Sequence, residues 1–370
     1  MLAAGICKHR VAKVQRSMKA CNSELLVLFP SANMLYLSGF YDEPSERLLL
    51  LFVPQEGEPI FLAPALYADQ IRQSSPVQDI RVWKDSDEPT VLLRRVLAEL
   101  APNEAGVLVD DTMWSMFLLM LETALPQADF SPASQVMVPL RMQKSPDELS
   151  HMRKASSIAD EAFEEVSRMN FTGLTELQVA AALEQAMRQR GAEGVAFETL
   201  VASGPNSAMP HYRAGQRRIE PGDVVILDFG CRVQGYCSDI TRTVVCQKPS
   251  KEIEAVYGIV RQAQERASQA IRPGVAAEEI DRAARSCITQ AGYGERFIHR
   301  TGHGIGLEVH EGPYINEGNA LQLQQGMTFS LEPGIYLPGK FGVRIEDIVT
   351  VGEKGAASLN HCTHELQVVE

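Results

Sequence analysis

The sequence predicts an α/β protein of two domains, and three observations support this prediction. The 370 residues exceed the size at which a single hydrophobic core usually stops growing. Short apolar runs typical of buried strands alternate along the chain with longer stretches of helical spacing. Ser145-Pro146-Asp147-Glu148 is a helix-start signature, with serine as the cap and acids facing the positive end of the helix dipole. We place the domain boundary just before it, which gives domains 1–140 and 141–370.

The first domain combines one clear helical pattern with several strand patterns. A helix is expected over residues 10–20. Buried strands are expected wherever short apolar runs recur, at residues 25–29, 34–37, 48–53, 60–62 and 107–109. The domain holds no histidine beyond His9. We therefore expect it to serve as a scaffold, a substrate gate or an oligomerisation unit, with the chemistry carried by the second domain.

The second domain alternates helices with hairpins. The apolar periodicity predicts four helices, over residues 146–168, 176–190, 251–271 and 276–291. Apolar β-branched runs predict strands between and after them, at residues 197–201, 224–227, 243–245, 327–331, 343–345 and 348–351. One hairpin turns around Gly235 and another around Gly339. This arrangement suggests a weak internal duplication of the domain.

Composition excludes some classes of partner. The 35 lysines and arginines against 47 aspartates and glutamates give a net charge of −12, which disfavours nucleic acid and anionic membranes. Seven scattered cysteines without a CxxC pair favour a reducing, cytoplasmic setting. The N-terminus reads as an amphipathic helix and not as a signal peptide, and no apolar run is long enough to span a bilayer.

Two aspartates on the first hairpin need a neutralising partner. The run Val224–Leu227 leads Asp228 into a buried setting, and the chain returns after the turn to Asp239. Like charges in a poorly solvated place repel each other and lose hydration. A pair of divalent metal ions would neutralise both. A protonated dyad, or one paired with Arg232 or Arg242, explains the hairpin about equally well.

Three other stretches carry groups that suit metal or proton chemistry. His303 lies between glycines that let a backbone pass close to a ligand, and Glu332 ends a strand pattern. Glu346 follows Arg344 at same-face spacing, so a buried ion pair between them is an alternative there. Oxygen-rich ligands with one imidazole suit Mn, Fe, Co or Zn in a two-metal site.

With these motifs together, LDFG, SDITRT, TGHGIG, LEPG and RIED, the chain resembles the pita-bread metallopeptidases. The resemblance is to their proline-specific branch, Xaa-Pro dipeptidase (prolidase) and Xaa-Pro aminopeptidase (aminopeptidase P), and covers almost the whole chain. It implies a creatinase-like N-terminal α/β domain and a pita-bread catalytic domain. It also implies two divalent ions, Mn first with Co, Fe or Zn as alternatives, and a bridging hydroxide as the nucleophile.

The resemblance assigns roles to individual residues. Asp239 would bind one metal in bidentate fashion, His303 and Glu332 the other, and Asp228 and Glu346 would bridge the two. Glu332 would also take the proton of the attacking water. In this assignment the metal ions neutralise Asp228 and Asp239, so Arg232 and Arg242 are not needed for that role.

Other residues receive supporting roles. His211, in MPHYRAG, and His310, in LEVHE, match substrate-contacting and proton-transferring histidines, although the residues alone are typical of a loop and a core histidine. Arg344 and Thr241 are expected to orient Glu346 and Asp239. An apolar wall for the proline ring is proposed from three aromatic residues, Phe197, Tyr212 and Tyr314. His299, His361 and His364 receive no role.

The implied substrates are small peptides with proline in the second position. General peptidases handle the Xaa-Pro bond poorly because it is a tertiary amide without an N–H. Many dipeptidases of this kind carry, where this chain has Tyr314, an arginine suited to the free carboxylate of a dipeptide. The alternative is therefore an aminopeptidase P, which cleaves longer peptides. A non-catalytic pita-bread binding protein is a more remote one. The resemblance also suggests a homodimer.

Overall fold

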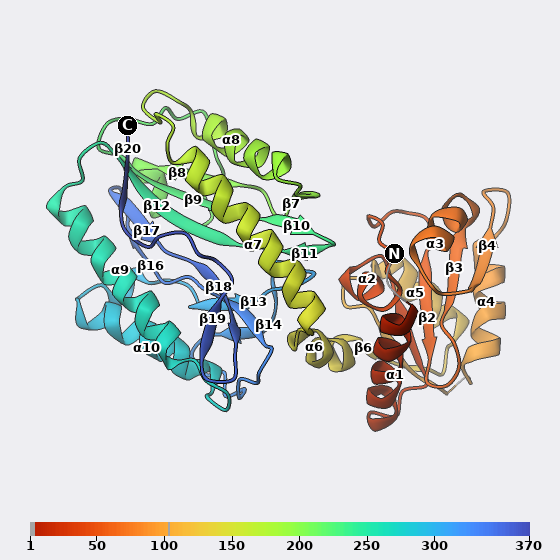
Figure 1. Cartoon of the computed structure of the whole chain (residues 1–370). Helices are drawn as coiled ribbons and strands as arrows, with labels where there is room; N and C mark the ends of the chain where they lie inside the picture. The colour runs from red at the N-terminus through yellow and green to blue at the C-terminus, as the bar shows by residue number, and fades with distance from the viewer. Residues whose placement is uncertain (1–3, 103) are drawn as a thin grey trace. The chain divides into compact units, whose positions relative to one another are not determined.

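The computed structural model describes residues 4–102 and 104–370. Its contacts divide the chain into two compact units, Met1–Leu140 and Arg141–Glu370 (Figure 1). The first unit is built around one sheet and the second around several smaller ones. No helix in the described residues combines the length and the apolar composition that crossing a membrane would require.

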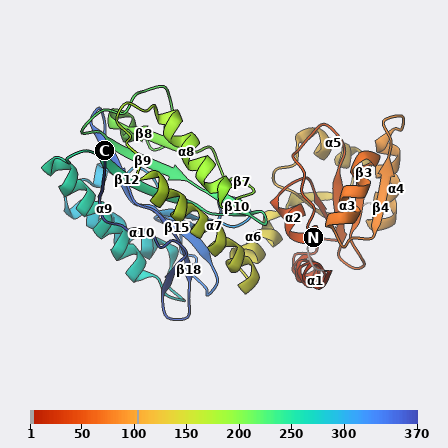
Figure 2. The same ribbon diagram turned by 45° about the horizontal axis from the view of Figure 1, so that its top comes forward.

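The first unit is an α/β domain around a six-stranded mixed sheet (Figure 2). The strands run in the order β4-β3-β2-β1-β5-β6. Their bounds are β1 Leu25–Leu28, β2 Leu50–Pro54, β3 Ile60–Pro64, β4 Asp79–Trp83, β5 Gly106–Val109 and β6 Asp129–Pro132. The helices are α1 Ala4–Ala20, α2 Ala32–Ser38, α3 Ala68–Ser74, α4 Pro89–Leu100, α5 Ser115–Ala124 and α6 Ser134–Met142, with a 3₁₀ turn η1 Ala65–Tyr67.

The core of this unit follows from the two-residue period of its strands. Leu25 and Val27 on β1 point to one face of the sheet, where they belong to a cluster with Leu93 of α4 and Phe117 of α5. On the other side, α1 contacts α2 and β2. β1 lies in the middle of the sheet, between β2 and β5. All four of its residues are buried, so the strand reads as a continuous apolar run.

The strand predicted over residues 34–37 is wrong. These residues lie in α2, whose cap Ser31 accepts hydrogen bonds from the backbone N–H groups of Asn33 and Met34. Gly39 ends the helix in the left-handed conformation, at φ 76°. Four apolar residues in a row suit a buried strand or a buried short helix equally, and here the cap selects the helix.

The second unit is confirmed to contain the four predicted helices: α7 Pro146–Val166, α8 Glu176–Gln189, α9 Lys251–Ala270 and α10 Ala277–Gln290. Two of them begin with a complete capping box, Ser145 with Glu148 and Thr175 with Gln178. In Figures 1 and 2, α7 lies beside α8 and α9 beside α10. Each pair packs on its own apolar cluster of buried residues, which the strands complete.

The strands of the second unit form four sheets. Their orders are β11-β10-β7, β20-β12-β9-β8, β14-β13-β15-β18-β19 and β16-β17. The bounds in the first half are β7 Gly194–Val195, β8 Leu200–Ser203, β9 Val224–Phe229, β10 Cys231–Val233, β11 Tyr236–Cys237 and β12 Ile240–Cys246, with η2 Gly204–Ala208. Those in the second half are β13 Gly302–Gly304, β14 Glu311–Ile315, β15 Thr328–Leu331, β16 Gly334–Leu337, β17 Phe341–Arg344, β18 Asp347–Val351, β19 Ala356–Ser358 and β20 Gln367–Val369, with η3 Gly294–Arg296.

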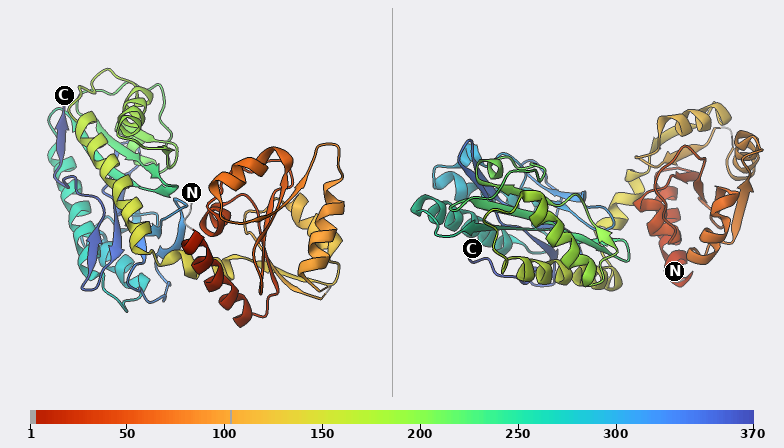
Figure 3. Two further views of the ribbon diagram at one scale, coloured as in Figure 1. Left: turned by 45° about the vertical axis from the view of Figure 1, so that its right-hand side comes forward. Right: turned by 90° about the horizontal axis from the view of Figure 1, so that it is seen from above.

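Both predicted hairpins are present. β9 pairs antiparallel with β12, with β10 and β11 at the tip, where Gln234 and Gly235 both have positive φ. The second, β16 with β17, turns at Gly339. The two halves of the unit are therefore each a helix pair followed by hairpins. The C-terminal strand β20 lies at the edge of its sheet, beside β12 (Figure 3).

Candidate metal centre

The strand ends of both halves bring all five predicted ligands to one pocket of about 390 Å³. Asp228 lies on β9 and Asp239 directly precedes β12. His303 is the central residue of β13, Glu332 follows β15, and Glu346 lies between β17 and β18. An isolated bridge between Thr241 and Glu346 joins β12 to the segment between β17 and β18. These side chains meet although up to 118 residues separate them in the sequence, from Asp228 to Glu346.

The side chains lie close enough to share a cation. Asp239, His303 and Glu346 each offer a ligand atom, and these atoms all lie within 4.8 Å of one another. The Nε2 atom of His303 is 3.3 Å from Oε1 of Glu332 and 3.8 Å from Oδ2 of Asp239. Such a group of carboxylates around one imidazole has the donor composition of a site for transition-metal ions.

Two carboxylate oxygens inside the cluster have no hydrogen-bond partner among the described residues: Oδ1 of Asp239 and Oε1 of Glu346. Both atoms are buried, and an unpaired buried carboxylate oxygen is costly. Burial, and then the neighbouring carboxylates, raise the pKa of both groups well above the usual range. Burial raises the pKa of Glu332 as well. A divalent ion would satisfy these oxygens and replace the protons, so the residues present fit a metal.

His303 is prepared to act as a ligand. Its Nδ1 atom lies 3.1 Å from the carbonyl oxygen of Gly304, so the tautomer with a proton on Nδ1 leaves the Nε2 lone pair facing the carboxylates. Burial lowers the pKa of His303 to about 4, which keeps the ring neutral near pH 7. Its backbone N–H donates to Ser330 Oγ, whose hydroxyl donates to Glu332. The hydroxyl of Ser330 thus connects two candidate ligands, His303 and Glu332.

The glycines beside His303 serve the backbone of neighbouring strands. A Cβ on Gly302 would lie 1.9 Å from the carbonyl oxygen of Ser330, and one on Gly304 would lie 2.0 Å from that of Gly312. We expected these glycines to let the backbone approach a ligand, but the structure shows that they allow close packing of strands. The glycines let β13 run close to its two partner strands while His303 alone points at the cluster.

The predicted supporting residues are present, but each binds a different carboxylate from the one expected. Arg344 donates through Nη2 to Asp228, where Glu346 was expected. Thr241 donates its hydroxyl to Oε2 of Glu346 at 2.6 Å, where Asp239 was expected, and accepts from Nε of Arg344 at 3.1 Å. The reason is the antiparallel register, which sets Thr241 opposite Asp228 and next to Glu346 across the bridge.

The two alternative neutralising arginines lie elsewhere. Arg242 is buried and pairs with Asp347. Arg232 donates to the carbonyl oxygens of Leu307 and Ala196. Neither of them pairs with a hairpin aspartate, so that alternative is wrong for both arginines. Arg344 pairs with Asp228 instead, whereas Asp239 has no arginine partner among the residues described.

Histidines line the pocket around the ligands. His211 and His310 are among the lining residues, and the rings of His303 and His310 lie 4.2 Å apart between centroids, nearly edge to face. Burial, and then the neighbouring His303, lower the pKa of His310 to about 4. His310 is thus a neutral hydrogen-bonding group at pH 7.

The sequence reasoning missed His299 and Arg300, which also line the pocket. The Nδ1 atom of His299 lies 2.7 Å from the carbonyl oxygen of Arg300, and its Nε2 atom lies 2.8 Å from the hydroxyl of Tyr336. That hydroxyl accepts from Nη1 of Arg344, so its own hydrogen is directed to His299. The only signal in the sequence was the short separation of both residues from His303.

The expected aromatic wall is only partly in the pocket. Phe197 lines it, together with the apolar residues Leu200 and Val309. Tyr212 packs instead against a small cluster that includes Tyr336. Tyr314 is exposed, and its ring lies beneath the guanidinium of Arg300, 4.5 Å from its central carbon.

Comparison with known proteins gives matches over most of the chain. Residues 150–353 match the family described as Metallopeptidase family M24, and residues 10–143 match the Creatinase/Prolidase N-terminal domain. The probable dipeptidase PepE of Mycobacterium tuberculosis is 43% identical over 348 residues, which are 93% of this chain and 92% of that protein. The Xaa-Pro dipeptidase of Lactobacillus helveticus is 35% identical over 96% of this chain and 98% of its own length. The crystal structure of a recombinant prolidase from Thermococcus sibiricus superposes with a TM-score of 0.94, at 41% identity, over 98% of this chain and 99% of that one.

Proposed function

The chain belongs to metallopeptidase family M24 and carries the creatinase N-terminal and pita-bread domains, and from this premise we propose that it is a dinuclear Xaa-Pro dipeptidase. Such an enzyme hydrolyses the bond between an N-terminal residue and proline. The observation that supports the proposal most directly is the convergence of four carboxylates and a neutral imidazole in one pocket. Two of these carboxylates have oxygens without a partner in the described part of the chain. The non-catalytic alternative has no support, because no ligand position is lost.

Asp228, Asp239, His303, Glu332 and Glu346 would hold two divalent ions in this proposal. When bound, such ions lower the pKa of water and polarise a carbonyl group. Glu332 lines the pocket, and in this proposal its carboxylate takes a proton from the attacking water and passes it to the proline nitrogen. The neutral ring of His310 and the ring of His211 line the pocket, where they can donate hydrogen bonds to the substrate carbonyl oxygen as negative charge develops there.

The apolar side of the pocket would hold the proline ring. Phe197, Leu200 and Val309 line that side, and they replace Tyr212 and Tyr314 as the proposed wall. A ring that packs against this surface would hold the tertiary amide at the cluster without needing an amide N–H. Selectivity for proline then comes from shape and apolar contact.

Arg300 supports the choice of a dipeptide as the substrate. Its guanidinium lines the pocket, stacks on Tyr314, and forms no ion pair with a carboxylate among residues 4–102 and 104–370. Its charge is therefore free to bind the carboxylate of a dipeptide, which lies next to the proline ring. In this proposal Arg300 binds the substrate carboxylate, the role that an arginine at the position of Tyr314 has in many dipeptidases.

Replacement of Arg300 by methionine is expected to raise the KM for a Xaa-Pro dipeptide by about tenfold to a hundredfold, the usual weight of a charged hydrogen bond. Steady-state kinetics on the dipeptide and on its C-terminal amide would measure this. The amide carries no charge for Arg300 to bind, so its KM should change little. An equal rise for both substrates would exclude carboxylate binding by Arg300.

One assay tests the function as a whole. The purified protein with added Mn²⁺ is offered a Xaa-Pro dipeptide, a Xaa-Pro-Yaa tripeptide and a Xaa-Ala dipeptide. We expect cleavage of the first substrate to dominate. Activity on the tripeptide alone would identify an aminopeptidase P, and equal cleavage of Xaa-Ala would reject proline specificity.

Mn²⁺ is proposed as the ion because the donor set is rich in oxygen, with Co, Fe or Zn as alternatives. A cytoplasmic location is proposed from seven unpaired cysteine thiols. The proposal of a homodimer rests on the family resemblance. Metal analysis of the purified protein and light scattering would test the first and the last of these.

The stabilisation that Mn²⁺ gives should increase from about pH 5.5 to about pH 7.5, because bound metal displaces protons from the carboxyl groups. Burial raises the pKa of Asp239, Glu332 and Glu346, so the metal-free fold holds protons above the range of an exposed carboxyl group. A raised pKa stabilises the metal-free fold at low pH, and this contribution is lost as the pH rises. His303 does not oppose the trend, because its pKa of about 4 leaves it neutral at both values.

Thermal unfolding with and without saturating Mn²⁺ at the two pH values measures this dependence. The increase in Tm caused by the metal is the quantity to compare, since it removes the pH dependence that both forms share. A larger increase at the lower pH would contradict the assignment of these carboxyl groups as ligands.

A further inference from the structure

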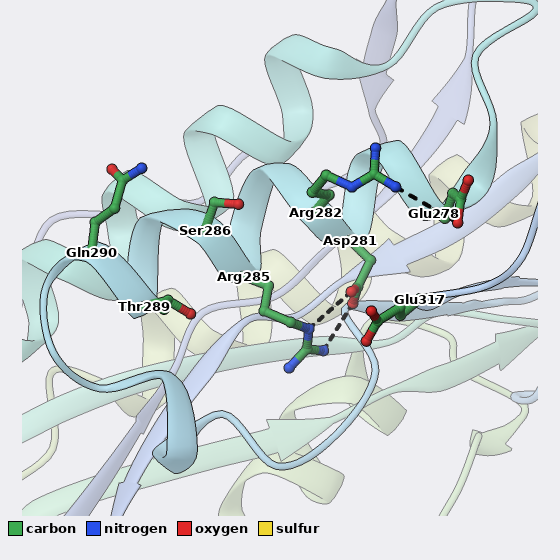
Figure 4. Close-up of a pocket in the computed structure, with 8 residues that line it drawn as sticks. All are labelled: Glu278, Asp281, Arg282, Arg285, Ser286, Thr289, Gln290 and Glu317. Atoms are coloured by element: carbon green, nitrogen blue, oxygen red, sulfur yellow. Dashed lines mark hydrogen bonds and ion pairs between the residues drawn. The ribbon is translucent and has the colours of Figure 1, made fainter.

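A second, polar pocket lies along α10, with a volume of about 340 Å³ (Figure 4). Asp281 and Arg285, one helical turn apart, form a paired contact in its wall, with two N–O distances of 2.9 Å. Figure 4 shows the guanidinium of Arg285 facing the carboxylate of Asp281. Asp281 is only 1% exposed, whereas the guanidinium is partly open to the pocket. The pair is therefore more than a solvated surface contact.

Arg285 uses its remaining donors on a neighbouring loop. Nη1 donates to the carbonyl oxygen of Phe297 at 3.0 Å, and Nη2 donates to that of His299 at 2.9 Å. The guanidinium also lies over the ring of Phe297, 4.3 Å from its centroid. A lysine could not make these contacts together, because they need the planar fork of guanidinium donors.

Asp281 holds the end of the same loop. Its Oδ1 atom accepts from the backbone N–H of Thr301 at 3.2 Å and from the hydroxyl of Thr301 at 2.7 Å. The segment 297–301 is thus fixed at three points by one ion pair. We call Asp281 and Arg285 together the α10 bracket.

The segment that the bracket holds forms a wall of the candidate metal centre. His299 and Arg300 line that pocket with their side chains. The carbonyl oxygen of Thr301 accepts from the backbone N–H of Glu332 at 2.8 Å. The bracket therefore binds the backbone of His299 and of Thr301, the two residues that flank Arg300 in the chain. One further hydrogen bond, from Glu332 to Thr301, connects the bracket to a candidate ligand.

We propose that Asp281 and Arg285 are positioning residues for substrate binding, acting through the backbone of 297–301. This inference rests on the proposed peptidase function. The bracket touches neither substrate nor metal, and its role is to hold His299 and Arg300 in the orientation that the substrate requires. Small displacements of such groups have large kinetic effects.

Arg282 provides a matched control on the same helix. Within the described residues its ion pairs are with Glu278 and Glu279, its own helical neighbours, and its side chain is 58% exposed. It lines the polar pocket as Arg285 does. A loss of helical ion pairing alone would thus affect the Arg282 and Arg285 variants alike.

The test compares Arg285→Met and Asp281→Asn with Arg282→Met. Hydrogen exchange of the amides in 297–301, followed by mass spectrometry, is measured first without substrate. We expect exchange at least about tenfold faster in the two bracket variants, as expected when a local opening is favoured by the loss of charged hydrogen bonds. Arg282→Met should exchange like the wild type.

Kinetics on a Xaa-Pro dipeptide give the second readout. The bracket variants should show a KM raised about tenfold or more, with a smaller change in kcat, since substrate-facing residues lose their orientation. Unchanged exchange at 297–301 would overturn the proposal, and so would faster exchange with an unaltered KM. A wild-type protein that cleaves no Xaa-Pro peptide would count against the proposed function, whereas the exchange comparison needs no substrate and would still test the bracket. If Asp281→Asn does not fold, the exchange and the KM of Arg285→Met alone test the proposal.

Discussion

Replacement of Asp239 by asparagine is expected to reduce the hydrolysis of Xaa-Pro dipeptides by about a thousandfold or more, the scale on which loss of metal activation acts. Asparagine keeps the size of the side chain but removes the charge. Oδ1 of Asp239 is buried and has no protein partner among the described residues, and this supports the proposal that it serves as a ligand. The variant should bind fewer than two Mn²⁺ ions.

The metal-free fold of this variant should be as stable as that of the wild type. Burial and the neighbouring carboxylates raise the pKa of Asp239, so the ionised group is under strain from like charges when no cation is bound. A neutral amide removes that repulsion. Metal content, kcat/KM and the Tm of the metal-free protein would be measured beside Asp147→Asn, which changes an exposed aspartate of the same unit. Near-normal turnover in Asp239→Asn would show that the metal site lies elsewhere.

Replacement of Arg242 by methionine is expected to lower the free energy of unfolding by about 3–5 kcal/mol, the cost of leaving one partner of a buried ion pair alone. Arg242 is fully enclosed and pairs with Asp347 at 2.7 Å. It also donates to backbone carbonyl oxygens of Glu346, Cys362 and Thr363. The loss would leave these buried acceptors without their donor.

The direction of the pKa shift of Asp347 is that of a carboxylate stabilised by its partners. Burial acts to raise this pKa, yet Arg242 and then His364 hold it below the usual value. Urea unfolding of the metal-free variant measures the effect, with Arg261→Met as the control. Arg261 pairs with Glu265 and Glu365 at the surface, so its loss should cost at most about 0.5 kcal/mol. Similar values for both variants would contradict a structural role for Arg242.

Much of the second unit could be predicted from local patterns. The helix at Pro146 begins where the sequence signature indicates, because serine, proline and glutamate act within the first turn itself. The strand at Val224 was predicted for a similar reason, since β-branched residues favour a pleated conformation over a few positions. The strand predicted at Met34 failed because four apolar residues suit two conformations.

The partners within the site could not be predicted in the same way. Arg344 binds Asp228 across 116 positions, and Thr241 binds Glu346 across 105. The strand register decided these pairs, and no short stretch of sequence contains it. His299 and Arg300 were overlooked for the same reason.

The sequence by itself determined the four helices of the second unit, most of its strands, and the set of acidic and histidine residues that can hold metal. These properties depend on residues that are neighbours in the chain. Only the tertiary structure decided that two carboxylate oxygens in the pocket have no partner among the described residues, and that Arg300 lines the pocket without a carboxylate partner among them. It also showed the α10 bracket behind the pocket wall. Pairing, burial and desolvation arise from contacts between distant segments, and those contacts exist only once the sheets have formed.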